Sequence, residues 1–99
     1  MAFLLSTFAC SATLDVQGPF APGETIPTKY TCDAENISPA LSWSAGPSGT
    51  ISYALIVDDP DAPGKVWVHW LAWNLSSTSL AEGAHPPVEG KNDFKKTGW

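Results

Sequence analysis

Proline and glycine interrupt this chain at short intervals, and no other feature restricts its fold as strongly. The 99 residues include nine Pro and eight Gly, and they are spread from residue 18 to residue 98 instead of lying in one linker. Proline fixes φ and removes a backbone donor, while glycine weakens helices, so both residues mark turns. Long helices have little room, and we expect short strands joined by turns.

Four segments between these turns have the composition of β-strands: residues 13–17, 40–44, 51–57 and 66–75. Segment 51–57 is apolar on both of its alternating faces, which predicts a central strand buried on both sides. Segment 66–75 is also apolar on both faces, and its Trp and Val content favours a strand over the alternative, a helix. Residues 76–89 show no sustained period and are expected to form a long surface loop. The predicted fold class is all-β.

Length and charge exclude several classes of protein. A chain of 99 residues supports one hydrophobic core, so one domain is expected. The net charge is −5, and all five cationic residues are Lys. Without an arginine fork for phosphates or base edges, we expect no nucleic acid partner. No apolar run reaches the roughly 18 residues of a membrane-spanning helix, so no transmembrane segment is predicted.

The first twelve residues, MAFLLSTFACSA, are apolar and carry no charged side chain. They end in a small-x-small pattern that is typical of a signal-peptidase site, although the positive n-region is missing. Residues 1–12 are therefore interpreted either as a clipped signal segment or as a tail or extra strand. Cys10 and Cys32 could form one disulfide in an oxidising compartment. If residues 1–12 are removed, Cys32 is expected to be a lone buried thiol.

Acidic and proline residues follow the third strand segment: Asp58, Asp59, Pro60, Asp61 and Pro63. The prolines stiffen this turn, and the next strand returns His69 to the same end of the sheet. Two carboxylates and an imidazole can then converge. The alternative is that the aspartates only cap turn amides while His69 fills a polar gap in the core.

Three catalytic interpretations lack the residues they need. Gly46-Pro47-Ser48-Gly49 does not match the G-x-S-x-G elbow of serine hydrolases. His69 and His85 are far apart and lack an H-E-x-x-H arrangement, so no metal site is predicted, and His85 is expected to be a solvated loop residue. Paired carboxylates of a glycosidase must flank a sugar cleft, which one tight turn does not provide. The residues alone therefore assign no catalytic centre to residues 58–70, and we expect no metal and no cofactor there.

Several motifs occur together in one order and carry a family resemblance. They are Ile26-Pro27, Tyr30-Thr31-Cys32, Asn36-Ile37-Ser38-Pro39, Leu41-Ser42-Trp43, Ala54-Leu55-Ile56-Val57, Asp59-Pro60-Asp61-Ala62-Pro63, Val68-His69-Trp70 and Asn92-Asp93-Phe94. Each motif alone is weak, but the ordered set is specific. From about Leu14 to Trp99 the chain resembles the phosphatidylethanolamine-binding protein family, in its bacterial and archaeal Raf-kinase-inhibitor-like branch.

The resemblance implies a β-sandwich with Greek-key topology and a non-enzymatic binding function. The ligand would be a small anion such as phosphate or a phosphorylated head group, and a partner kinase or protease could be regulated. By motif, the pocket residues would be Asp59, Asp61, Pro63 and His69. His69 would donate to the anion, and an aspartate would orient the imidazole and favour its charged form.

Two departures from the family pattern complete these expectations. The family pocket is completed by a later segment, G-P-x-P-P-x-G-x-H-R-Y, which should begin where this chain stops. The resemblance thus predicts that residues 13–99 are the N-terminal part of the domain, incomplete at the C-terminal end, with weak anion affinity. The alternatives are a structural fragment that forms a homodimer through an exposed sheet edge, and a hydrolase, which would require turnover. Residues 1–12 precede the expected family start, which favours an export signal and a periplasmic or secreted location.

Overall fold

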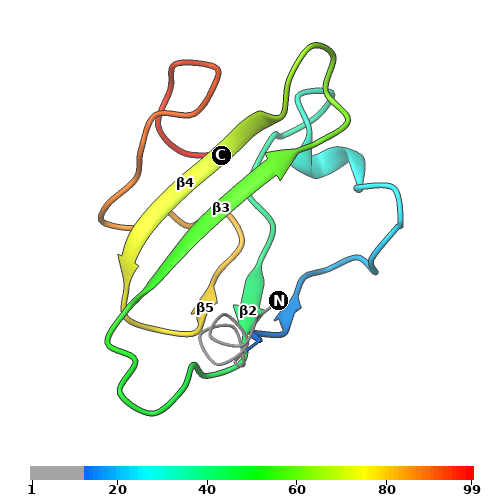
Figure 1. The fold of residues 1–99 in the computed structure, drawn as a ribbon. Helices are drawn as coiled ribbons and strands as arrows, with labels where there is room; N and C mark the ends of the chain where they lie inside the picture. Colours follow the sequence, from blue (N-terminus) through cyan, green and yellow to red (C-terminus); the bar gives the residue numbers. More distant parts are fainter. Residues whose placement is uncertain (1–12) are drawn as a thin grey trace, which may run out of the picture.

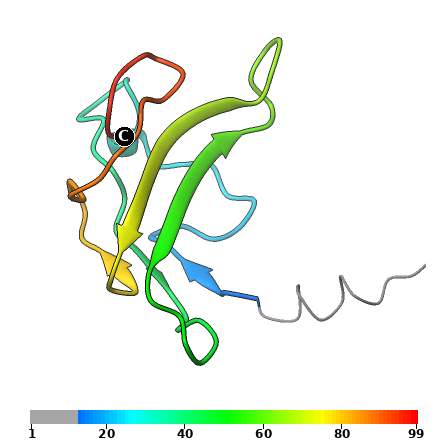
Figure 2. The same cartoon turned by 60° about the vertical axis from the view of Figure 1, so that its left-hand side comes forward.

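The computed structural model describes residues 13–99, which form two antiparallel sheets (Figure 1). The elements are β1 (Val16–Gln17), the 3-10 turn η1 (Thr28–Tyr30), β2 (Leu41–Trp43), β3 (Tyr53–Asp59), β4 (Trp67–Leu75) and β5 (Ser79–Leu80). One sheet has the order β1-β2-β5, and the other is the β3-β4 hairpin. Figure 2 shows the hairpin as a layer of its own in front of the smaller sheet. The all-β prediction is confirmed, whereas Greek-key topology stays a prediction.

The β3-β4 hairpin contains two bulges that place an extra residue in β4. Tyr53 lies opposite Leu75, but Leu55 lies opposite Ala72, so β4 advances by three residues while β3 advances by two. The second irregularity lies between the pairs Val57–Trp70 and Asp58–Val68 and leaves His69 without a partner in the ladder. Bulges bend a strand and redirect its side chains, and they recur next to functional sites.

The core lies on one face of β4 and is closed by the end of the chain. Its buried apolar residues are Tyr30, Trp70, Ala72 and Leu75. The indole of Trp70 is fully buried, and its Nε1 donates to Glu89 Oε1 at 2.7 Å. Trp99 packs edge-on against Trp70, with 5.9 Å between ring centroids, and its own Nε1 donates to the carbonyl of Tyr30. The C-terminal segment is therefore part of the core.

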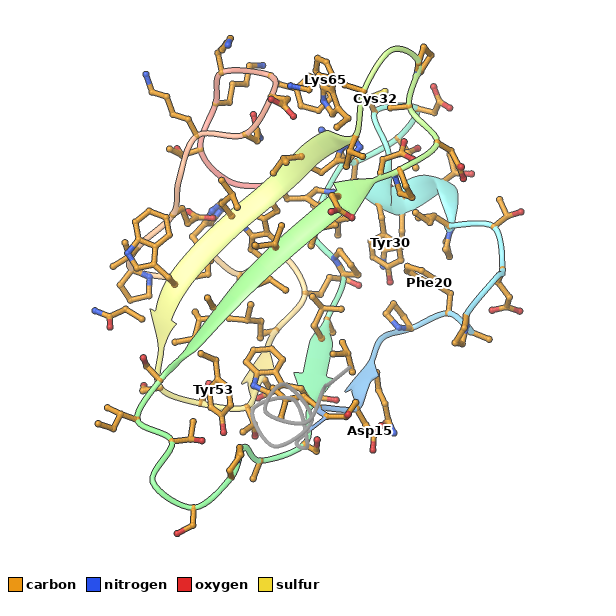
Figure 3. All side chains as sticks on the ribbon, in the orientation of Figure 1. Asp15, Phe20, Tyr30, Cys32, Tyr53 and Lys65 are labelled. Carbon is orange, nitrogen blue, oxygen red and sulfur yellow. The ribbon has the colours of Figure 1, made fainter. Side chains whose placement is uncertain are left out.

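An aromatic pair joins the two sheets. The rings of Trp43 on β2 and Tyr53 on β3 meet edge to face, with 5.8 Å between their centroids. The hydroxyl of Tyr53 also accepts a hydrogen bond from the amide of Gly46 at 2.8 Å. Figure 3 shows Tyr53 at the end of β3 that lies nearest to the smaller sheet. This contact fixes where the hairpin crosses the other layer.

Within residues 13–99, segment 51–57 does not form the central strand buried on both sides that the sequence predicts. The strand runs from Tyr53 to Asp59 and pairs only with β4 among the described residues. Its exposure alternates strictly, and Ile56 on the outer face is 64% exposed. No element of residues 13–99 covers that face. Apolar residues on both faces show that a strand could be buried on both sides. They do not show that a second layer is present to cover it.

Three further expectations differ from the structure. Residues 76–89 are not loop throughout, because β5 pairs with β2 and Glu89 bridges to Ala72. The single alternation expected for 66–75 is wrong, since the bulges bring Leu75 to the buried face and leave Trp73 exposed. Cys32 is exposed and not a buried thiol.

The predictions for residues 1–12, including Cys10, lie outside the described residues. Within residues 13–99, no helix is long and apolar enough to cross a membrane.

Candidate functional site

The hairpin brings His69 to Asp59, as the turn between the strands predicts. Asp59 lies opposite Trp67 in the ladder, two residues from His69. His69 Nε2 is 3.9 Å from Asp59 Oδ2, and the two side chains are 36% and 44% exposed. This distance is too long for a hydrogen bond but suits an ion pair once the imidazole is protonated. One carboxylate, instead of the two expected, thus faces the imidazole.

Asp61 and Pro63 lie in the turn and are exposed. The amide of Asp61 donates to Asp59 Oδ1 at 2.9 Å, so Asp59 caps the turn while it faces His69. Asp59 therefore combines the turn cap of one interpretation with the approach to His69 of the other. No hydrogen bond or ion pair joins the side chain of Asp61 to His69 within residues 13–99. Of the four predicted residues, the structure brings two together.

An aromatic side chain from the C-terminal loop completes the surroundings of His69. The ring centroid of Phe94 is 5.5 Å from that of His69 and 5.2 Å from that of Trp67. Phe94 is itself half exposed, so an apolar surface adjoins the imidazole. We call Asp59, Trp67, His69 and Phe94 the His69 surface. Sequence reasoning did not assign Phe94 to the site, although the motif Asn92-Asp93-Phe94 contains it.

Asn92 attaches that loop to His69 through its buried side chain. Its Nδ2 donates to the carbonyl oxygens of His69 at 3.1 Å and Gly98 at 2.9 Å. Its Oδ1 accepts from the amides of Phe94 at 2.9 Å and Lys96 at 3.1 Å. One side chain thus holds both the bulge residue and the loop that carries Phe94. This role depends on contacts across about twenty residues of sequence and was not predicted.

Asp93 fastens the residue before His69. Its carboxylate accepts from the amide of Val68 and from Lys65 Nζ, at 2.6 and 3.0 Å. The hydrogen bond from Val68, followed by that from Lys65, lowers the pKa of Asp93 from its ordinary value of 3.8. Lys65 is labelled in Figure 3 beside the loop that ends the chain. Neighbouring loop residues therefore hold Val68 and His69 in place.

The imidazole is available to a ligand. Within residues 13–99, no hydrogen bond engages either of its ring nitrogens, so each can donate or accept. Nor do three His, Cys, Asp or Glu side chains in that range gather as metal ligands would. Two surface hollows lie beside β1 and β2, and neither is lined by any of the four predicted residues. The His69 surface is open, with a donor, a carboxylate and two aromatic rings.

Comparison with known proteins gives the same family over nearly the whole described chain. Residues 16–99 match the family model for phosphatidylethanolamine-binding protein. A UPF0098 protein of Methanothermobacter thermautotrophicus is 51% identical, with 75% of this chain and 55% of that protein covered. A UPF0098 protein of Chlamydia muridarum is 46% identical, with coverage of 81% and 59%.

Two solved structures share the fold. A phosphatidylethanolamine-binding protein homologue of Chlamydia trachomatis, CT736, superposes with a TM-score of 0.80 at 38% identity, covering 87% of this chain and 62% of that one. The structure of Escherichia coli YbcL, called a new member of the mammalian PEBP family, gives 0.76 at 34% identity, covering 87% and 63%. This chain thus spans less than two thirds of each of these four proteins. On sequence and on fold, the chain belongs to the phosphatidylethanolamine-binding protein family.

Proposed function

We propose that this chain binds small phosphate-type anions, including phosphorylated head groups, at the His69 surface, and that it does so without catalysis. The observation that carries the proposal is the position of His69. A bulge redirects this residue, its side chain remains partly exposed beside Asp59, and its ring nitrogens have no partner within residues 13–99. Family membership supports a ligand-binding role for the chain.

The side chains around His69 suit a phosphorylated ligand of mixed character. An imidazole N–H can donate to a phosphate oxygen, and the bond is stronger when the ring is charged. Asp59 can keep the protonated ring oriented. Phe94 and Trp67 offer apolar contact for the carbon atoms of a head group. We place Asp61 and Pro63 at the rim of the site, on the turn that Asp59 caps.

Binding is proposed instead of turnover because, within residues 13–99, His69 is not paired with a hydroxyl or thiol nucleophile. Within residues 13–99, no Ser, Thr or Cys side chain makes a hydrogen bond to His69. Nucleophilic catalysis needs such a side chain within hydrogen-bond reach of the base.

The experiment uses the two histidines of the chain as site and control. Nitrogen-15 resonances of both imidazoles are followed while phosphate, and separately phosphoethanolamine, is added. We expect a saturable shift of His69 and none of His85, an exposed loop residue. His69→Ala should abolish binding measured by calorimetry, whereas His85→Ala should leave it intact. Equal responses of both imidazoles, or unchanged phosphate affinity in His69→Ala, would refute the proposal. A response to phosphoethanolamine alone would assign the site to head groups over free phosphate.

A further inference from the structure

Lys65 places its ammonium group on the aromatic part of the His69 surface. Its Nζ lies over the ring of Trp67, 5.7 Å from the ring centroid. Trp67 packs against Phe94, and Phe94 packs against His69, with 5.2 and 5.5 Å between the ring centroids. Lys65 precedes His69 by four residues, so their Cα atoms are at most about 13 Å apart. An anion held between these two side chains therefore lies within about 8 Å of the ammonium, which is the Debye length at physiological ionic strength.

One carboxylate holds both this ammonium group and the strand that carries His69. Asp93 Oδ1 accepts from Lys65 Nζ at 3.0 Å, and its Oδ2 accepts from the amide of Val68 at 2.6 Å. An ammonium has three N–H donors, and within residues 13–99 Asp93 engages one of them. Holding a flexible lysine in place before a ligand arrives reduces the ordering cost of binding. Lys65 is thus positioned beside the site with donors left for a ligand.

The acidic turn beside His69 makes a second cation important for a phosphate ligand. Asp59 faces the imidazole, and Asp58 and Asp61 are exposed close to it in the chain. Each of these carboxylates repels an anion, whereas a protonated imidazole supplies a single positive charge. The repulsion grows with the negative charge of the ligand. Lys65 supplies a positive charge that offsets it.

We infer that Lys65 is the second cation of the anion site and makes it selective for phosphomonoesters over phosphodiesters. The inference rests on the proposed function, because Lys65 acts on the ligand that His69 holds. A phosphomonoester carries about −1.5 to −2 charges at pH 7. The phosphodiester group of an intact phospholipid carries a single negative charge. Since the Coulomb energy is proportional to the charge of the ligand, a second ammonium stabilises the monoester more than the diester.

Titration with phosphoethanolamine and with glycerophosphoethanolamine tests the charge selectivity. The two ligands share the ethanolamine group, but the first is a phosphomonoester and the second is a phosphodiester. Dissociation constants are measured from the His69 imidazole resonance at neutral pH and low salt. Lys65→Gln should raise the dissociation constant of the diester about two- to threefold, as expected for the loss of one exposed ion pair. It should raise that of the monoester by about the square of this factor, because the ligand charge is doubled.

Lys29→Gln is the matched control. Lys29 Nζ is also paired with a carboxylate, 3.1 Å from Glu82 Oε1, and it also lies over an aromatic ring, 5.4 Å from the centroid of Tyr30. Lys29 belongs to η1, and neither of its partners belongs to the His69 surface. Its replacement should therefore leave the preference for the monoester unchanged. Lys65→Arg keeps the positive charge and should keep the preference as well.

The His69 resonance separates the failure of this inference from the failure of the proposed function. If His69 responds but Lys65→Gln weakens both ligands equally or neither of them, the inference is overturned and anion binding stands. An equal loss of preference in Lys29→Gln would also overturn it, because the effect would then come from the total charge of the chain. If His69 of the wild-type chain responds to neither ligand, the proposed function itself is refuted.

Discussion

Replacing Asn92 by Ala removes the side chain that ties the C-terminal loop to the His69 bulge. The variant loses four hydrogen bonds, two donated by Nδ2 and two accepted by Oδ1. Each is worth about 1 kcal/mol net, which sums to about 4 kcal/mol. The amides of Phe94 and Lys96 lie in exposed residues and can bond to water instead. We therefore expect Asn92→Ala to lower the free energy of unfolding by about 2–4 kcal/mol.

The assay is urea unfolding followed by tryptophan fluorescence at one protein concentration. Gln17→Ala is the control, since Gln17 is an exposed polar residue of β1 whose side chain makes no hydrogen bond among residues 13–99. Its effect should stay within about 0.5 kcal/mol. Asn92→Asp retains the oxygen that accepts from the loop, but it replaces the donor by an oxygen facing two carbonyls. It should therefore fail to restore stability at neutral pH.

The same variant also tests whether Asn92 holds His69 in place. If Asn92 holds His69, then Asn92→Ala at low temperature, where it stays folded, should also broaden or shift the His69 imidazole resonance and leave His85 unchanged. A loss of stability below about 1 kcal/mol, close to that of the control, would refute the reasoning.

Three further predictions concern charge and packing. The β4 amide that donates to Asp93 lowers the pKa of this carboxylate. The ionised carboxylate therefore stabilises the fold above pH 3.8, and this stabilisation is lost as the pH falls through the pKa that Asp93 has in the folded state. Asp93→Asn should flatten the decline of the urea midpoint at acid pH. A hydrogen bond with Glu82 raises the pKa of Lys29 from 10.5. The contribution of this pair to folding stability is therefore complete below pH 10.5 and is lost at higher pH. Glu82→Gln should remove this alkaline dependence of the melting temperature. Gly90→Ala would place a Cβ 2.9 Å from the Trp73 ring and should cost about 1–3 kcal/mol in urea unfolding, whereas Gly18→Ala, with its nearest atom at 3.4 Å, should be close to neutral.

The sequence predicts the pairing of Asp59 with His69 because a short stiff turn leaves few other outcomes. Two strands joined by such a turn must run antiparallel, so residues a few positions from the turn on either side approach each other. The same argument does not extend to Asp61 or Pro63, because residues inside the turn project from the sheet instead of lying along it. Their exposure follows from that position.

Long-range contacts account for what sequence reasoning missed. Nothing local to Asn92 or Phe94 indicates that their loop folds back on β4, since the contacts span more than twenty residues. The exposure of Ile56 was missed for a related reason. The apolar character of Ile56 does not reveal whether another layer of protein covers it or whether it faces solvent.

The bulge at His69 shows why the site and the core depend on each other. In a regular ladder that starts from the pair Asp59–Trp67, His69 would oppose Val57, and Trp70 would fall on the outer face with Ile56. Because His69 is left out of the ladder, Trp70 instead opposes Val57 on the inner face, where it is fully buried. Burial of an indole this size is among the largest single contributions to a small core. The core thus favours the bulge, and the bulge leaves His69 unpaired beside Asp59. A change that made the ladder regular would expose Trp70 and move His69 into the ladder, opposite Val57.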